Sequence, residues 1–152
     1  MALKPDRYEL QTDISFFYNA GTATRGGVVV HGSTVGGGAS MDDGTNLVAY
    51  DATAGKIPVG ILLNDVVNKD LTRTHLNQYK DEVQKGGKVT VLRKGYVVTN
   101  NVDGTPVGGS GAYVSETVAG NLTMATDEGE LVGRFLSDAD ADGYAKVEIN
   151  LP

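Results

Sequence analysis

The residues best suited to chemistry form an acidic run near the C-terminal end of the chain. It alternates aspartate with small residues: Asp138-Ala139-Asp140-Ala141-Asp142-Gly143. This spacing matches the opening of an EF-hand calcium loop, which completes its oxygen shell with a glutamate at the loop's end. The corresponding position is Ile149, and the residues before it alternate as in a strand. We therefore expect Asp138, Asp140 and Asp142 to form a solvated turn between two strands, with a weak calcium site as the alternative.

The histidines and the glycine-rich loops show no catalytic motif, although the members of a Ser-His-Asp triad need not lie close together along a chain. His31 and His75 are the only histidines, there is no cysteine, and no carboxylate lies at the short spacing of a zinc site. Gly36–Gly38 and Gly108–Gly111 have neither the Lys-Ser/Thr of a phosphate-binding loop nor the frame of a nucleophile elbow. We predict a protein that is not an enzyme, with no catalytic residues, no metal and no cofactor.

The composition predicts an all-β protein. The 152 residues fit one domain, valine outnumbers leucine, and 21 glycines recur at short intervals. Branched side chains fit a pleated sheet, while glycine supplies the turns between short strands. Strand patterns spaced about ten residues apart favour a sandwich or barrel-like sheet over βαβ units. The predicted strands are Ile14–Tyr18, Gly27–His31, Asn46–Asp51, Val59–Leu63, Lys88–Leu92, Tyr96–Asn100, Gly111–Glu116, Leu122–Ala125, Glu130–Leu136 and Tyr144–Leu151.

The chain divides into residues 1–20, an N-terminal arm with the first strand, and residues 21–152, a single β domain. We expect the first dozen residues to be extended and to find their contacts elsewhere, another subunit being one such place. The alternation places Ile14, Phe16 and Tyr18 on one face as core, which leaves Tyr8 and Leu10 as the better contact residues.

Two internal features complete the organisation. Apolar residues recur every fourth position between Asp65 and Lys85 and predict a short helix near residues 69–84. Because threonines in this segment are poor helix formers, an irregular excursion is the alternative. A faint repeat relates residues 46–65 to 111–138, each with a strand whose glycine permits close backbone approach. Coincidence in a chain rich in glycine and valine is the alternative explanation.

The charge balance excludes several partners. Thirteen basic and 19 acidic residues give a net charge of −6, which repels DNA and RNA. Residues 1–7 lack the apolar core of a signal peptide, and the most apolar stretch, Ile57–Leu63, is too short to span a bilayer. We expect a soluble protein made in the cytoplasm, with no direct nucleic-acid partner and no membrane partner.

Several stretches resemble the capsid decoration proteins of tailed phages, also called cement or head-stabilisation proteins. The resemblance covers the chain from about Gly21 to the C-terminus, and none of its motifs is catalytic. The stretches are Pro58–Val67, Lys80–Val83, Gly86–Val89, Arg93–Asn100, Gly111–Val114, Leu131–Leu136 and the acidic turn leading into Val147–Pro152.

The resemblance implies a small β barrel or tulip-like fold on the outer face of an icosahedral head. Family members often form trimers and clamp neighbouring major capsid subunits, frequently through N-terminal arms. The apolar residues of the arm that we predict for capsid or subunit contact are Leu3, Tyr8, Leu10 and Phe17.

The alternative function is a particle-displayed adhesin or carbohydrate-binding β module. It would use exposed aromatic residues, and the absence of tryptophan weakens it. The tyrosines that could serve it are Tyr79, Tyr96, Tyr113 and Tyr144.

Overall fold

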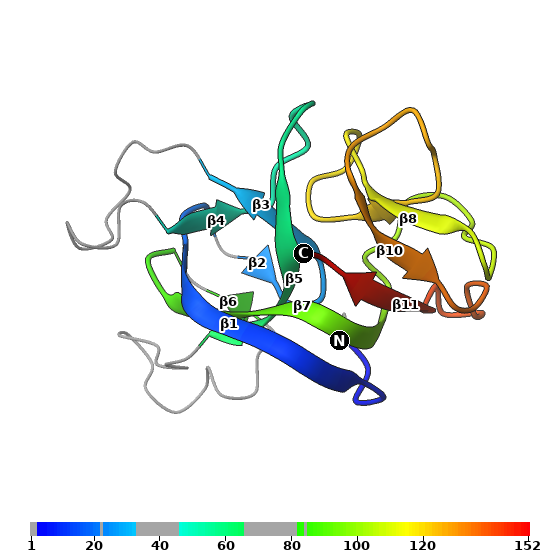
Figure 1. The fold of residues 1–152 in the computed structure, drawn as a ribbon, viewed down its shortest axis with the longest axis horizontal. Helices are drawn as coiled ribbons and strands as arrows, with labels where there is room; N and C mark the ends of the chain where they lie inside the picture. Colours follow the sequence, from blue (N-terminus) through cyan, green and yellow to red (C-terminus); the bar gives the residue numbers. More distant parts are fainter. Residues whose placement is uncertain (1–2, 22, 33–45, 66–81, 84) are drawn as a thin grey trace.

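Every regular element in the described part of the chain is a β-strand (Figure 1). The computed structural model describes residues 3–21, 23–32, 46–65, 82–83 and 85–152. The strands are β1 (Tyr8–Tyr18), β2 (Ala23–Thr24), β3 (Val28–His31), β4 (Leu47–Ala49), β5 (Pro58–Asp65), β6 (Glu82–Val83), β7 (Lys88–Thr99), β8 (Gly111–Val114), β9 (Leu122–Thr123), β10 (Leu131–Phe135) and β11 (Ala145–Asn150). The prediction of an all-β protein is confirmed. Among the described residues there is no helix that could cross a membrane.

Strand pairing closes a ring and then extends beyond it. The ring runs β1-β4-β3-β5-β7 and returns to β1, with only the β1–β4 pair parallel. From β7 the sheet continues through β11, β10, β8 and β9, while β2 and β6 form a separate small sheet. β7 therefore belongs to both parts, and β1 lies beside it (Figure 1).

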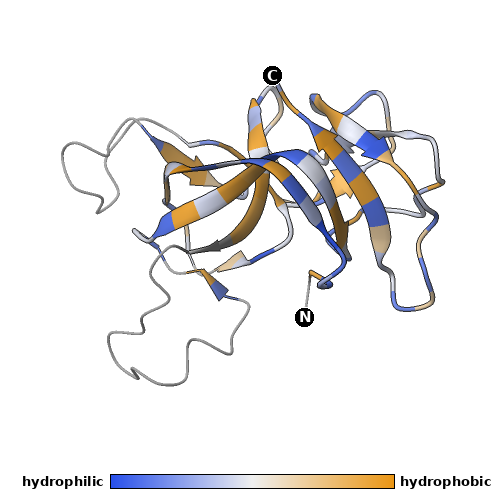
Figure 2. Cartoon of the chain, turned by 60° about the horizontal axis from the view of Figure 1, so that its bottom comes forward, coloured by the Kyte–Doolittle hydropathy of each residue, from blue (hydrophilic) through white to orange (hydrophobic). Residues whose placement is uncertain are grey.

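Alternation along the strands fills two hydrophobic clusters. In β3, Val28 and Val30 pack into the cluster shared with β10 and β11, whereas Val29 packs into the other. That second cluster draws Tyr18, Val48, Leu62 and Val91 from the other four strands of the ring. The same alternation of hydrophobic and hydrophilic residues is visible along the ribbon in Figure 2. A period of two in the sequence thus distributes side chains to opposite faces of a pleated strand.

The predicted strands Lys88–Leu92 and Tyr96–Asn100 are parts of one strand, β7. Gly95, which stands between the two predicted strands, lies within β7 at φ +140°. A Cβ built there would lie 2.1 Å from the carbonyl oxygen of Tyr8. The glycine therefore permits the close approach of β1 instead of ending the strand.

The predicted helix and the internal repeat remain to be compared with the structure. The predicted helix near residues 69–84 lies outside the described residues except for Glu82–Val83, which form β6. The two glycines that define the repeat, Gly60 and Gly133, are both tightly approached by backbone. A Cβ would lie 2.2 Å from the Leu92 carbonyl oxygen at the first and 1.8 Å from that of Glu148 at the second. The division of the chain at residue 20 and the common origin of the repeat stay predictions.

Candidate functional site

Strand β1 carries three large apolar side chains into solvent. Tyr8, Leu10 and Ile14 are 55%, 67% and 53% exposed. The strand is held along β7 through pairs that run from Tyr8–Tyr96 to Phe17–Lys88. The described residues supply a strand on its other edge only at Phe17–Tyr18, where β4 pairs with it. The predicted contact residues Tyr8 and Leu10 are therefore accessible, on a strand fixed to its own chain and not on a free arm.

Ile14 was expected in the core, and this expectation is wrong. Asp13 pairs with Val91 but Phe16 pairs with Val89, so β1 contains one extra residue at this point. The amide and hydroxyl of Ser15 both donate to the Asp13 carboxylate and keep its pKa below the ordinary value. The bulge changes the alternation. Phe16 packs against the hydrophobic cluster that contains Tyr18 and Val91, while Ile14 turns outward into solvent.

Two other predicted contact residues, Leu3 and Phe17, are less accessible to a partner than Tyr8 and Leu10. Leu3 is 2% exposed within the cluster shared with β10 and β11, and it forms an isolated bridge with Thr99. Phe17 is half-buried, with the Lys88 ammonium 5.7 Å from its ring centre. Leu3 serves the fold of its own chain, so we do not include it in the contact surface proposed below.

Residues 3–6 are fastened to the acidic turn and the adjoining strand. The Lys4 ammonium lies 2.8 Å from the Asp140 carboxylate and 4.3 Å from the centre of the Tyr144 ring. The hydrogen bond from Lys4 is the main cause that lowers the pKa of Asp140. Asp6 makes a longer pair with Lys146, at 3.8 Å. The extended start of the chain is thus attached to the C-terminal strands.

The acidic turn uses its carboxylates to organise backbone. Asp140 accepts hydrogen bonds from the amides of Asp142 and Tyr144 at 3.0 and 2.8 Å. Asp138 accepts one from the Gly108 amide at 2.7 Å. These are the contacts of a solvated turn between β10 and β11, the preferred interpretation of this motif. Among the described residues, no group of three or more His, Asp or Glu side chains is placed to hold a metal ion.

A row of cross-strand neighbours runs from β1 across the exposed face of the sheet. Tyr8 pairs with Tyr96, Tyr96 with Glu148, and Glu148 with Arg134, so all four lie on one face. The two tyrosine rings stack with centres 6.1 Å apart, and the Lys146 ammonium lies 4.0 Å from the Tyr96 ring centre. Sequence reasoning missed this row because its members lie on four separate segments.

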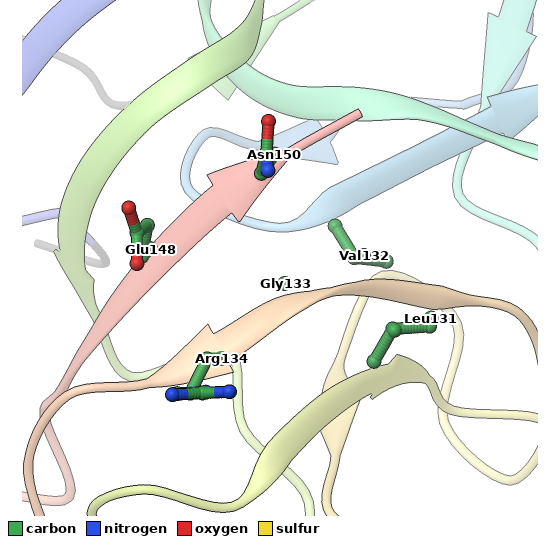
Figure 3. A pocket seen from close by; sticks show the side chains of 6 residues that line it. All are labelled: Leu131, Val132, Gly133, Arg134, Glu148 and Asn150. Atoms are coloured by element: carbon green, nitrogen blue, oxygen red, sulfur yellow. The ribbon is translucent and has the colours of Figure 1, made fainter. Parts of the chain in front are cut away.

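The row ends at a hollow of about 370 Å³ between β10 and β11 (Figure 3). Leu131, Arg134, Glu148 and Asn150 are exposed around it, and Gly133 also lines it. The side chains of Arg134, Glu148 and Asn150 make no hydrogen bond or ion pair with any described residue. The hollow therefore offers donors and acceptors that the fold itself does not use.

The remaining candidate residues are the two histidines and four of the tyrosines. His31 ends β3, with its ring edge-on to Phe16 at 6.0 Å, and His75 lies outside the described residues. Of the tyrosines considered for carbohydrate binding, Tyr79 also lies outside them. Tyr96, Tyr113 and Tyr144 line neither the hollow at Gly133 nor the neighbouring one at Ile57.

In the part of the chain that the structure describes, this is an all-β protein. Its exposed apolar residues on β1 and the hollow between β10 and β11 are suited to contact with another protein. Comparison with protein families identifies it further. The sequence model of a phage family, described as "Structural cement protein (E217 gp24/Pam3 gp6)", matches residues 6–150. The chain belongs to this phage structural cement protein family, which confirms the resemblance found in the sequence. Comparison with curated proteins gives no match. Membership assigns the protein a structural, capsid-stabilising role in the virion.

Proposed function

We propose that this cement protein binds the outer surface of an icosahedral phage head as a homotrimer and clamps neighbouring major capsid subunits. The observation that carries the proposal is the exposure of Tyr8, Leu10 and Ile14 on β1. Large apolar residues that a protein keeps in solvent on one element are suited to become the buried centre of an interface. The role is structural and involves no catalysis.

The charge of the chain supports an outer location. With a net charge of −6, the protein is repelled by packaged DNA, whereas the outer surface of the shell keeps it away from that polyanion. Contact through apolar side chains does not depend on attraction between opposite charges.

A homotrimer supports clamping through multivalency. Three copies of β1 would engage three capsid sites, so that a modest affinity at each site becomes tight attachment once the first is bound. Closed symmetry of this kind also fits the three-fold positions of an icosahedral shell.

The proposal is tested by sedimentation with heads assembled without the protein. The free chain should sediment as a trimer and bind saturably to these heads. Leu10→Ser should weaken binding about tenfold, since an interface residue at the centre of a contact contributes more than about 1 kcal/mol.

Val118→Ser is the matched control, because Val118 is also an exposed apolar residue, at 43%, and lies away from β1. A wild-type chain that fails to bind the heads contradicts the proposal. Equal affinity of the Leu10→Ser and control variants contradicts the assignment of β1.

A further inference from the structure

Two hollows on the surface share Leu131 in their lining, and we refer to the two together as the groove. The first is the hollow at Gly133, and the second has a volume of about 400 Å³. Their sizes fall within the range of roughly 300–1,000 Å³ typical of binding sites. We infer that this groove binds an extended, uncharged segment of a major capsid subunit. The inference rests on the proposed function and adds a second contact to that of β1.

The second hollow suits an apolar side chain. Ile57 and Leu131 line it with 61% and 55% of their surface exposed, and Pro58 and Leu151 add apolar wall. Its polar lining consists of His31 and of Arg93 and Glu130, whose charges are opposite. The Arg93 guanidinium, also in the lining, donates to the carbonyl oxygen of Pro152 and so fixes the C-terminal residues beside the hollow. An apolar side chain bound here would remove both Ile57 and Leu131 from water.

The first hollow suits main-chain amides. Arg134 donates hydrogen bonds, Glu148 accepts them, and Asn150 does both. Because Arg134 and Glu148 are cross-strand neighbours of opposite charge, a charged ligand would be attracted by one and repelled by the other. A peptide bond presents one donor and one acceptor without net charge, which matches this lining.

The alternatives fit less well. Among the described residues, neither hollow is lined by tyrosine or phenylalanine, and the His31 ring offers a smaller surface to the apolar face of a sugar ring than those side chains would. The groove is also continuous with the proposed contact on β1 through the row Tyr8–Tyr96–Glu148–Arg134. A capsid subunit that covers β1 would therefore extend naturally to the groove three strands away.

The experiment compares two exposed leucines that are five positions apart. Leu131→Ser is expected to weaken binding to heads about tenfold, while Leu136→Ser, at a leucine 44% exposed and outside both hollows, should leave it unchanged. A photo-crosslinking residue at position 131 should join the chain to the major capsid protein, and one at position 136 should not.

Each outcome is decisive. If Leu10→Ser weakens binding but Leu131→Ser does not, the groove is no capsid site although the proposed function stands. Crosslinks from position 131 only to another copy of this chain would overturn the inference. So would binding of a neutral oligosaccharide by the free protein that Leu131→Ser abolishes, because the occupant would then be a glycan. If the wild-type chain does not bind heads at all, the proposed function itself fails.

Discussion

Replacing Gly95 with alanine tests how β1 is held against β7. Gly95 lies in β7 at φ +140°, a conformation that L-residues rarely adopt. The new Cβ would lie 2.1 Å from the Tyr8 carbonyl oxygen, whereas real Cβ atoms almost never approach closer than 3.0 Å. The backbone at Tyr8 must therefore retreat by about 0.9 Å, which disturbs the pairing at one end of β1.

Two costs contribute to the expected loss of stability. A residue with a side chain in this backbone region costs about 1–3 kcal/mol. Weakening of one backbone hydrogen bond between β1 and β7 adds about 0.5–1.5 kcal/mol. The free energy of unfolding should fall by about 2–4 kcal/mol, which for a chain of this length lowers Tm by roughly 10 °C.

Substitutions at two further glycines separate the cost of the backbone conformation from that of the steric contact. Gly104 has φ +78° and open space around it, so Gly104→Ala measures the backbone cost alone. Gly133 has no positive φ, but its Cβ would lie 1.8 Å from the Glu148 carbonyl oxygen, so Gly133→Ala measures the steric contact alone. Both are compared with Gly95→Ala at one protein concentration.

The assay is urea denaturation followed by circular dichroism, with amide hydrogen exchange to locate the change. Gly95→Ala should destabilise more than Gly104→Ala and should raise exchange in residues 8–11. A Gly95→Ala protein no less stable than Gly104→Ala, with unchanged exchange in β1, would refute the close packing of β1 on β7.

Two predictions concern other contacts. Tyr50 accepts a hydrogen bond from the Gly27 amide at 2.9 Å and donates one to the Thr24 carbonyl oxygen at 2.6 Å. Tyr50→Phe removes the partner of the Gly27 amide and of the Thr24 carbonyl oxygen, so the free energy of unfolding, measured by urea denaturation, should fall by about 1–3 kcal/mol. Unchanged stability would count against these two hydrogen bonds. The pKa of Asp140 is lowered by Lys4, so the Lys4–Asp140 pair should persist above the ordinary carboxyl pKa of 3.8 and be lost as pH falls through the lowered value. The NMR chemical shifts of the Lys4 side chain should change as the pair is lost in acid. The Asp140→Asn variant should show at neutral pH the Lys4 shifts that the wild-type protein shows in acid. Identical Lys4 shifts in the wild-type and variant proteins at neutral pH would exclude the pair.

The sequence predicted the strands whose character is local. Alternating apolar residues and glycine turns predicted strands at Gly27–His31 and Glu130–Leu136. Each agrees to within one residue at either end with the observed β3 (Val28–His31) and β10 (Leu131–Phe135). Tyr8 and Leu10, predicted as contact residues, are exposed on β1, and their contact with a partner stays a prediction.

Features set by distant residues were not predictable. Whether Gly95 ends a strand or admits a neighbour depends on β1, which lies more than eighty residues earlier in the chain. Ile14 turns outward because a bulge adds a residue, and the alternation of the sequence contains no sign of it. The burial of Leu3 depends on β10 and β11, at the other end of the chain. The groove at Leu131 is likewise assembled from segments far apart in sequence.

The attachment of β1 to its own chain bears on how the protein can act as cement. A free arm would lose about 1–2 kcal/mol of backbone entropy per residue when it became ordered on a capsid. The eleven residues of β1 are already ordered by β7, so binding through Leu10 and Ile14 does not require that cost. The Tyr8–Arg134 row spans three strand spacings, about 14 Å at roughly 4.8 Å each, and its members keep fixed relative positions on one sheet. If the protein clamps capsid subunits as proposed, such a surface would resist their relative movement, because a shift of either subunit would break contacts on a rigid body and could not be absorbed by a flexible tether.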